Sequence, residues 1–337
     1  MASALRPSIV FAVLFVVSCA LATVGGVAAE SDAPLALESA IPLPDVRGRI
    51  DHITADLKRK RLIVAELGNN TADVVDLSSS HVIHRVDGLS EPQGVGYSAR
   101  ADLILIANAG DGSLRLFTGE NFIPAGSIEL GDDADNVRIN PRNGLVVVGF
   151  GTGGLALIDP AVRAKVAQIP LSAHPEGFQI DPQTDRAFVN IPNAGQIAAV
   201  DLKTRRLVVS WRTDGLRDNF PIALQPASVL LVIAFRRPPV LALVNRNTGD
   251  LSQRMTTCGD ADDVFFDERR QRIYLSCGSG TIDAFQIESA RIRPLHSTNT
   301  APGARTSLFL PELDRLFIAR PAGLTGSAAI LVYRPVP

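Results

Sequence analysis

A segment of about 42 residues recurs seven times along this chain, and this period constrains the fold more than any single motif. Each copy contains an apolar run, a tight polar turn and a second apolar run, as in RLIVAELGNNTADVVDL from Arg61 and RAFVNIPNAGQIAAVDL from Arg186. Residues at equivalent positions, 41 to 44 residues apart, are Glu66, Asn108, Phe150, Ile191, Phe235, Cys277 and Arg320. The sequence therefore predicts a repeat architecture.

Each repeat predicts four short strands. In the first copy, DHITAD from Asp51 is followed by RLIVAEL from Arg61, a Gly/Asn turn, ADVVDL, and finally HVIHRV from His81. One sheet of this size cannot bury both of its faces, so the repeats must pack on one another. Seven copies suit a closed ring around a central channel, which predicts an all-β fold, the seven-bladed β-propeller.

The two ends of the repeat region predict how the ring closes. The last repeat, 303–333, supplies about three strands, whereas a spare strand-like segment, LALESAIPLP from Leu35, precedes the first repeat. Pairing this segment with the last blade would complete that blade and remove two exposed strand edges. We therefore expect a single propeller domain over residues 30–337, closed by its N-terminal strand.

Residues 1–29 read as a secretion signal. Arg6 precedes an apolar stretch over 9–17, and Val27-Ala28-Ala29 supplies small residues for cleavage. This pattern predicts a periplasmic or secreted protein. The alternative is a lipoprotein whose VVSC sequence would be acylated and anchored at Cys19. No later stretch is long and apolar enough to predict a transmembrane helix.

The balance of charges limits the class of partner. The chain has 33 Lys and Arg against 35 Asp and Glu, a formal net charge of −2. This near-neutral balance gives no support for a nucleic acid as partner. We expect a monomer.

Two cysteines fall in the sixth repeat, near the same rim of its first hairpin. Cys258 and Cys277 could form a disulfide in an oxidising compartment, and two half-buried thiols are the alternative. The sequence contains no CxxC or CxxCH motif that would favour a zinc or haem site.

The loops that lead into the first strand of each repeat should meet at one end of the channel, where propellers usually carry their function. Aligning the repeats on Asp56, Asn140, Asp181 and Asp267 brings a mostly polar column into register. This first column is Asp51, Gln93, Asp135, Glu176, Phe220, Asp262 and Arg305; the second is His52, Gly94, Asn136, Gly177, Pro221, Asp263 and Thr306. The columns predict a charged channel mouth, unless these side chains only bond loop amides and channel waters.

Converging carboxylates must be compensated by a cation, by protonation or by water. Calcium or another divalent metal would suit such oxygen ligands, and the predicted ligands are Asp135, Glu176, Asp262 and Asp263. Arg305 is a compensating cation supplied by the chain itself. His52 could serve as a base or a further ligand, and His174 precedes Glu176 closely enough to support it.

Further charge lies on the loops between the second and third strands. Arg236 and Arg320 lie on these loops in the fifth and seventh repeats, and together with Arg305 they predict a rim that is basic on one side and acidic on the other. A small anionic ligand or an acidic loop of a partner protein would fit this polarity. The predicted ligand-binding residues are Asp51, His52, Gln93, Asn136, Glu176, Arg236, Arg305 and Arg320.

A Lys or Arg, an apolar tetrad and a Gly/Asn turn recur in the repeats, with LIVA at Leu62, AFVN at Ala187 and IYLS at Ile273. This pattern resembles the bacterial YVTN β-propeller repeat family, over roughly residues 35–333. The resemblance implies an exported propeller and fixes no catalytic residue.

Three functions remain open, and the sequence does not decide whether the protein is an enzyme. A binding module with a charged mouth agrees best with the lack of GxSxG, HExxH or phosphate-loop motifs. A calcium-type hydrolase, resembling the lactonases built on six-bladed propellers, would use the mouth carboxylates with His52 or Glu66 as base. A redox-associated propeller would need His52 as a haem ligand, and the chain has a single Trp where quinoproteins have several.

Overall fold

The computed structural model describes residues 1–2, 33–225, 227–288, 291–323 and 326–337. The predicted secretion signal, its cleavage site and Cys19 lie outside the described residues. Within the described part of the chain, no helix is long and apolar enough to cross a membrane.

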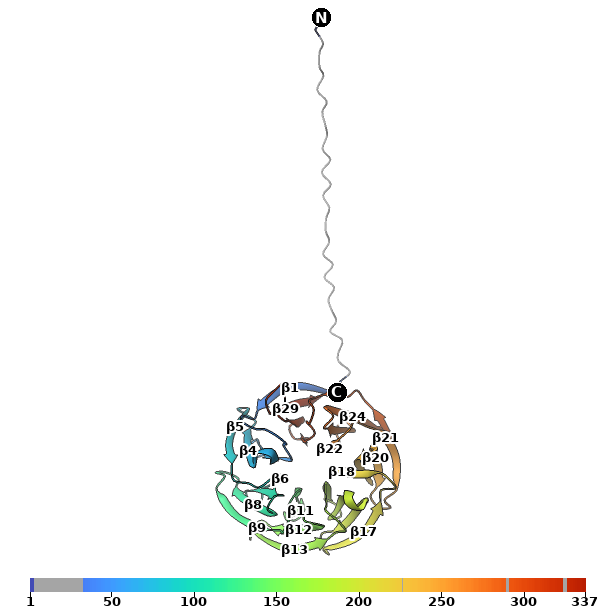
Figure 1. The fold of residues 1–337 in the computed structure, drawn as a ribbon. Coiled ribbons are helices and arrows are strands. Elements are labelled where there is room, and N and C mark those ends of the chain that lie inside the picture. Colours follow the sequence, from blue (N-terminus) through green and yellow to red (C-terminus); the bar gives the residue numbers. More distant parts are fainter. Residues whose placement is uncertain (3–32, 226, 289–290, 324–325) are drawn as a thin grey trace. The chain divides into compact units, whose positions relative to one another are not determined.

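Seven antiparallel sheets follow one another along residues 33–337 as the blades of a ring (Figure 1), which confirms the predicted seven-bladed propeller. Blade 1 contains β2 (Ile53–Asp56), β3 (Arg61–Glu66), β4 (Thr71–Asp76) and β5 (His81–Val86). Blade 2 contains β6 (Pro92–Ser98), β7 (Leu103–Asn108), β8 (Ser113–Thr118) and β9 (Pro124–Glu129). Blade 3 contains β10 (Val137–Ile139), β11 (Val146–Phe150), β12 (Gly154–Asp159) and β13 (Ala164–Pro170).

The remaining blades repeat this order of strands. Blade 4 contains β14 (Phe178–Asp181), β15 (Arg186–Ile191), β16 (Gln196–Asp201) and β17 (Arg206–Arg212). Blade 5 contains β18 (Arg217–Leu224), β19 (Leu230–Arg237), β20 (Pro239–Asn245) and β21 (Leu251–Thr256). Blade 6 contains β22 (Ala261–Asp267), β23 (Arg272–Cys277), β24 (Thr281–Glu288) and β25 (Arg291–Pro294), with β26 (Thr298–Asn299) also on β24. Blade 7 contains β27 (Ser307–Leu310), β28 (Arg315–Arg320), β29 (Ala329–Pro335) and β1 (Leu35–Pro42).

The N-terminal strand closes the ring, as predicted. β1 pairs antiparallel with β29, with Leu35 opposite Pro335 and Ile41 opposite Ile330. Its backbone groups thereby satisfy the edge that β29 would otherwise expose. Blade 7 is therefore assembled from both ends of the described domain.

The core lies in the packing between blades. Leu62 and Val75 of blade 1, for example, pack in one buried cluster with Phe317 and Ile330 of blade 7. The second and third strands are apolar without alternation because both of their faces are covered by neighbouring blades. Burying one such side chain stabilises the fold by about 1.5–3 kcal/mol.

The repeat positions found in the sequence mark the ends of the second strands. Glu66, Asn108 and Phe150 are the last residues of β3, β7 and β11. Blade 5 differs, because β19 continues past Phe235 to Arg237. The register of β18 against β19 also shifts between Asn219 and Ile222. Arg236 lies in this extension of β19.

Candidate functional site

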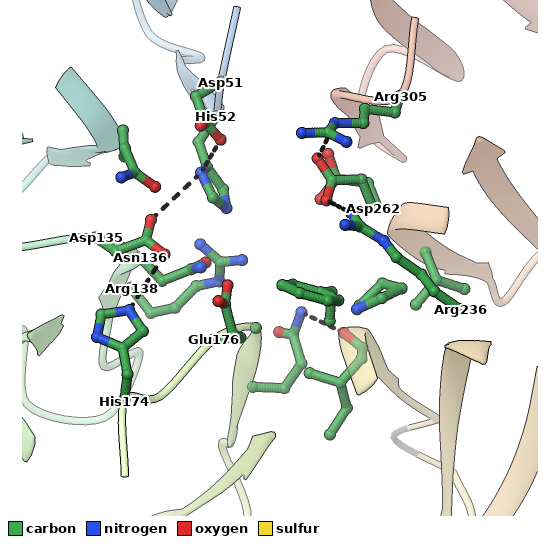
Figure 2. A pocket seen from close by; sticks show the side chains of 18 of the residues that line it. Asp51, His52, Asp135, Asn136, Arg138, His174, Glu176, Arg236, Asp262 and Arg305 are labelled. Carbon is green, nitrogen blue, oxygen red and sulfur yellow. Dashed lines mark hydrogen bonds and ion pairs between the residues drawn. The ribbon is translucent and has the colours of Figure 1, made fainter. Parts of the chain in front are cut away.

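A cavity of about 440 Å³ occupies the channel end where the first strands of the blades begin (Figure 2). All seven residues of the first aligned column line it, from Asp51 in blade 1 to Arg305 before blade 7. Five residues of the second column line it as well: His52, Asn136, Gly177, Pro221 and Asp263. The alignment of the repeats therefore located the side chains that meet at this end of the channel.

The other two residues of the second column, Gly94 and Thr306, contact neighbouring blades at the mouth. A Cβ on Gly94 would lie 2.0 Å from the carbonyl oxygen of Asp135, so the neighbouring blade leaves room for a glycine alone. Thr306 does not line the cavity, and its hydroxyl donates to the carbonyl of Ile50 over 3.0 Å. These contacts hold the first strands of adjacent blades together around the mouth.

Two histidines face one buried carboxylate on the side of blades 1, 3 and 4. His52 Nδ1 lies 3.0 Å from Asp51 Oδ1 and 3.9 Å from Asp135 Oδ1 (Figure 2). His174 Nε2 lies 3.9 Å from the other oxygen of Asp135, and its Nδ1 donates to the carbonyl of Gly151 over 2.7 Å. Asp135 thus stands between two imidazoles.

The charges around these imidazoles keep them protonated. Burial alone would lower the pKa of His52, but the close contact with Asp51 and the charges of Asp51 and Asp135 outweigh it and raise the pKa to about 9. Burial likewise opposes a charge on His174, whereas Asp135 and the Gly151 carbonyl raise its pKa to about 9. At neutral pH both histidines are therefore cations.

Glu176 lies in the same sector without a partner of its own. Burial raises the pKa of its carboxyl to about 8, and the charge of Asp135 adds to this effect. Among the described residues its side chain makes no hydrogen bond and no ion pair. Near neutral pH Glu176 is therefore mainly a neutral carboxylic acid that can donate a hydrogen bond into the cavity.

Arg138 is a cavity residue that the two aligned columns missed. Its guanidinium donates to the carbonyl of Val137, its neighbour in the chain, and within the described structure it forms no ion pair with a carboxylate. The group lies 5.7 Å from the ring centre of Phe178. Loss of water contact lowers the pKa of Arg138, although Asp263 and Asp135 favour its charge. Arg138 follows Asn136 by two residues, so strand alternation could have found it.

The arginines of blades 5 to 7 carry their own counter-ions. Arg236 forms an ion pair with Asp262 and a second, of 3.2 Å, with Asp260. Arg305 contacts Asp260 at 2.8 Å and Asp262 at 3.2 Å. The predicted basic side of the rim is therefore wrong at Arg236 and Arg305, because both arginines are neutralised by Asp260 and Asp262 of blade 6, which lies between them in the ring.

Arg320 is not part of the cavity lining. Its guanidinium donates to the carbonyl of Ser327 over 3.0 Å. Glu66, predicted as an alternative base, is also absent from the lining: it is fully buried in blade 1, where it accepts a hydrogen bond from Thr71. Position within the repeat did not reveal that these two side chains turn away from the channel.

The four predicted metal ligands have different partners. Asp262 lies between two arginines, Asp263 accepts a hydrogen bond of 2.7 Å from the amide of Ser307, and Asp135 faces the two histidines. In the described ranges no group of three or more His, Cys, Asp or Glu side chains is arranged to hold a metal ion. The structure therefore does not gather the predicted calcium ligands around one point.

One wall of the cavity is apolar. It is formed by residues of β18 and β22: Phe220, Pro221, Ile222, Val264 and Phe265. Phe220 lies beneath Arg236, whose guanidinium carbon is 3.9 Å from the ring centre. The cavity thus has a charged side on blades 1, 3 and 4, whereas blades 5 and 6 contribute apolar side chains together with the paired Arg236 and Asp262.

A disulfide fixes the segment that leads into β22. The structure joins Cys258 to Cys277, with 6.0 Å between their Cα atoms. The amide of Cys258 also donates to Asp283 over 2.8 Å. The bond anchors the chain immediately before Asp260 and Asp262, the two acids that hold Arg236 and Arg305.

Comparison with known proteins extends to the fold alone. The structure is similar to Kuenenia stuttgartiensis Hydrazine Synthase, with a TM-score of 0.74 and 14% sequence identity over 82% of this chain and 93% of that chain. At this identity the likeness concerns the arrangement of blades. No family model matches the chain, and no curated protein matches its sequence. The resemblance to the YVTN family therefore stays a prediction.

Proposed function

We propose that this protein is a binding module that holds a small organic anion in the channel mouth. The volume of about 440 Å³ lies within the range of sites for small molecules. Both charged and apolar groups line the cavity, as in sites that orient a ligand by a few polar contacts. The protein partner considered from the sequence is less favoured, because the arginines of the rim are already paired.

The observation that carries the proposal is the guanidinium of Arg138. It lies in the cavity with no carboxylate partner in the described structure, while Arg236 and Arg305 in the same cavity are paired with aspartates. A half-buried arginine without a counter-ion is costly, and an anionic ligand would compensate it by a charge-assisted, bidentate contact.

Binding has more support than hydrolysis. A general base must be unprotonated at working pH, yet the pKa of His52 is about 9 and that of Glu176 is about 8. These groups suit a cation and a hydrogen-bond donor at neutral pH. The redox alternative gains nothing from the structural comparison, which shows a shared fold.

We further propose that the protein is exported, as its leader and its resemblance to YVTN propellers suggest. The disulfide between Cys258 and Cys277 supports this, because such bonds persist in oxidising compartments. N-terminal sequencing of the protein recovered from the producing cell would test it: cleavage after Ala29 is expected, and an acylated Cys19 would replace this proposal by the lipoprotein alternative.

Thermal unfolding and calorimetric titration with acetate, benzoate, succinate and phosphate would test the binding proposal. At least one carboxylate should raise the melting temperature of the wild type, since a ligand of the native state stabilises it by mass action. The effect should vanish in Arg138→Gln and persist in Arg142→Gln, a matched arginine of blade 3 that contacts Gln183 outside the cavity. No response to any anion, or equal responses in both variants, would exclude the proposal.

A further inference from the structure

Side chains from the charged and the apolar walls of the cavity lie at the same depth in the channel. Arg138 in β10, Gln179 in β14 and Phe265 in β22 each lie two residues before the residue used to align their repeats. All three line the cavity, so they belong to one layer of the channel. Blades 3 and 6 are three steps apart in a ring of seven, which places Arg138 and Phe265 across the channel from each other.

The apolar wall is not explained by packing alone. Phe265 contacts the buried cluster around Tyr274 and Phe309 on one side, but it is only half-buried and its other side lines the cavity. Ile222 and Val264 also line the cavity. A channel that served only to hold water would have no use for an aromatic ring at this depth, whereas an apolar ligand group would cover it and be stabilised by doing so.

We infer that the ligand is a monocarboxylate with an apolar body about the size of an aromatic ring, which spans the channel from Arg138 to Phe265. This inference rests on the proposed function and adds the chemical class of the ligand. The carboxylate would accept two hydrogen bonds from the guanidinium of Arg138. The body of the ligand would lie against Phe265 and Ile222.

The charges around the cavity explain why one carboxylate is expected and not two. Arg236 and Arg305 are neutralised by Asp260 and Asp262, so no second unpaired arginine is available in the described lining. A second carboxylate would meet Asp51 or Asp263 and be repelled. Glu176, which is neutral near pH 7, can instead donate a hydrogen bond to the single carboxylate or to a hydroxyl beside it.

Four probes separate the parts of this inference in calorimetric titrations of the full-length mature protein. Phenylacetate has both the carboxylate and the ring, acetate lacks the ring, phenylacetamide lacks the charge, and phenylmalonate carries a second carboxylate. We expect phenylacetate to bind at least about tenfold more tightly than acetate, because burying a ring of this size corresponds to roughly 10- to 100-fold in affinity. It should also bind more tightly than phenylacetamide, which cannot form the charge-assisted contact with Arg138, and than phenylmalonate, whose second carboxylate would be repelled.

Two variants assign the contacts. Phe265→Ala should weaken phenylacetate about tenfold and leave acetate unchanged, and Arg138→Gln should abolish binding of both. The control is Phe266→Ala, which removes the next phenylalanine of β22 from the packing between blades and not from the cavity lining. If Phe265→Ala does not fold, Phe265→Leu replaces it in the test. This variant keeps an apolar side chain, so its affinity for phenylacetate should be intermediate.

Each contrary result has a definite meaning. If acetate and phenylacetate bind equally, the inferred ligand class is wrong and the anion-binding function stands. Equal binding of phenylacetamide would remove Arg138 from ligand recognition and contradict both proposals. Tighter binding of phenylmalonate would overturn the restriction to one carboxylate. If no probe binds, the anion-binding function and the ligand class fail together.

Discussion

The two ends of the first strands use the same residue types in opposite ways. At the far end, Arg59 contacts Asp56 and Asp102 at 2.8 Å and also donates to Tyr97. Arg270 repeats this arrangement with Asp267 and Asp314, at 3.0 and 2.6 Å. In each case the arginine bridges one blade to the next. At these two positions the far end therefore pairs its arginines with carboxylates and joins neighbouring blades.

The mouth leaves comparable groups without partners. Arg138 and Glu176 form no ion pair within the described structure, and buried oxygens of Asp135 and Asn136 have no hydrogen-bond partner there. Unpaired polar groups cost stability, so a fold retains them mainly where they serve a function. The comparison teaches that the far end is built for stability and the mouth for an additional molecule.

The largest effect is expected at the far end. Arg270→Ala should lower the free energy of unfolding by about 2–4 kcal/mol, because it leaves the buried carboxylate of Asp267 without its cation. Arg269→Ala is the control: this arginine is 76% exposed and contacts Asp314 at 3.6 Å, so its removal should cost less than about 0.5 kcal/mol. Urea denaturation measures both, and equal losses would contradict a special role for the paired network.

A second effect concerns Glu66, the buried acid at the end of β3 where the chain returns to the mouth end. Burial raises the pKa of Glu66 to about 8, with Asp73 adding to the shift while the Thr71 hydroxyl and Arg85 oppose it. The unfolded state loses this proton near pH 4.5 and the native state near pH 8. The stability contribution is therefore present at low pH and declines as pH rises from 4.5 to 8.

Glu66→Gln should remove this decline. The amide can still accept from Thr71, and it cannot become a buried anion beside Asp73. We expect the variant to be about 1–3 kcal/mol more stable than the wild type at pH 9 and closer to it at pH 5. Urea denaturation at the two pH values provides the test, and a variant less stable at pH 9 would show that the ionised carboxylate is needed.

The mouth histidines predict a third, smaller effect with the same sign. His52 and His174 have native pKa values of about 9, above the ordinary value of 6.5. Their contribution to stability is complete below pH 6.5 and is lost as pH rises through 9. The free energy of unfolding of Glu66→Gln should therefore still fall between pH 6.5 and 9. As pH rises, the free energy of unfolding of His52→Gln should fall less steeply than that of His81→Gln, because His81 is exposed. If the two variants show the same dependence on pH, His52 does not contribute as predicted.

The sequence predicted which residues line this site better than it predicted which of them form ion pairs with one another. The period of 42 residues determined the blades and the closing strand, because only ring packing buries sheets of this size. It also located Asp51, Asp135 and Glu176 in one cavity. The partner of each side chain was not predictable, since it depends on how far a side chain of one blade reaches over the next. Arg236 shows this: β19 is longer than its counterparts, and the residue that neutralises it, Asp262, lies in another repeat.

The smallest change in stability is expected from Arg138→Gln. The sign of this change shows whether Arg138 stabilises the fold, as Arg270 does at the far end of the channel, or serves a ligand. If the mouth were a structural network like the far end, removing its arginine would destabilise the fold, as for Arg270. A guanidinium that has lost water contact without gaining a carboxylate instead costs free energy, so its replacement should leave stability unchanged or raise it by up to about 1 kcal/mol. Urea denaturation of the ligand-free protein decides between them. A loss of more than about 1 kcal/mol would make Arg138 part of the scaffold, whereas preserved stability together with lost anion binding would assign its charge to the ligand.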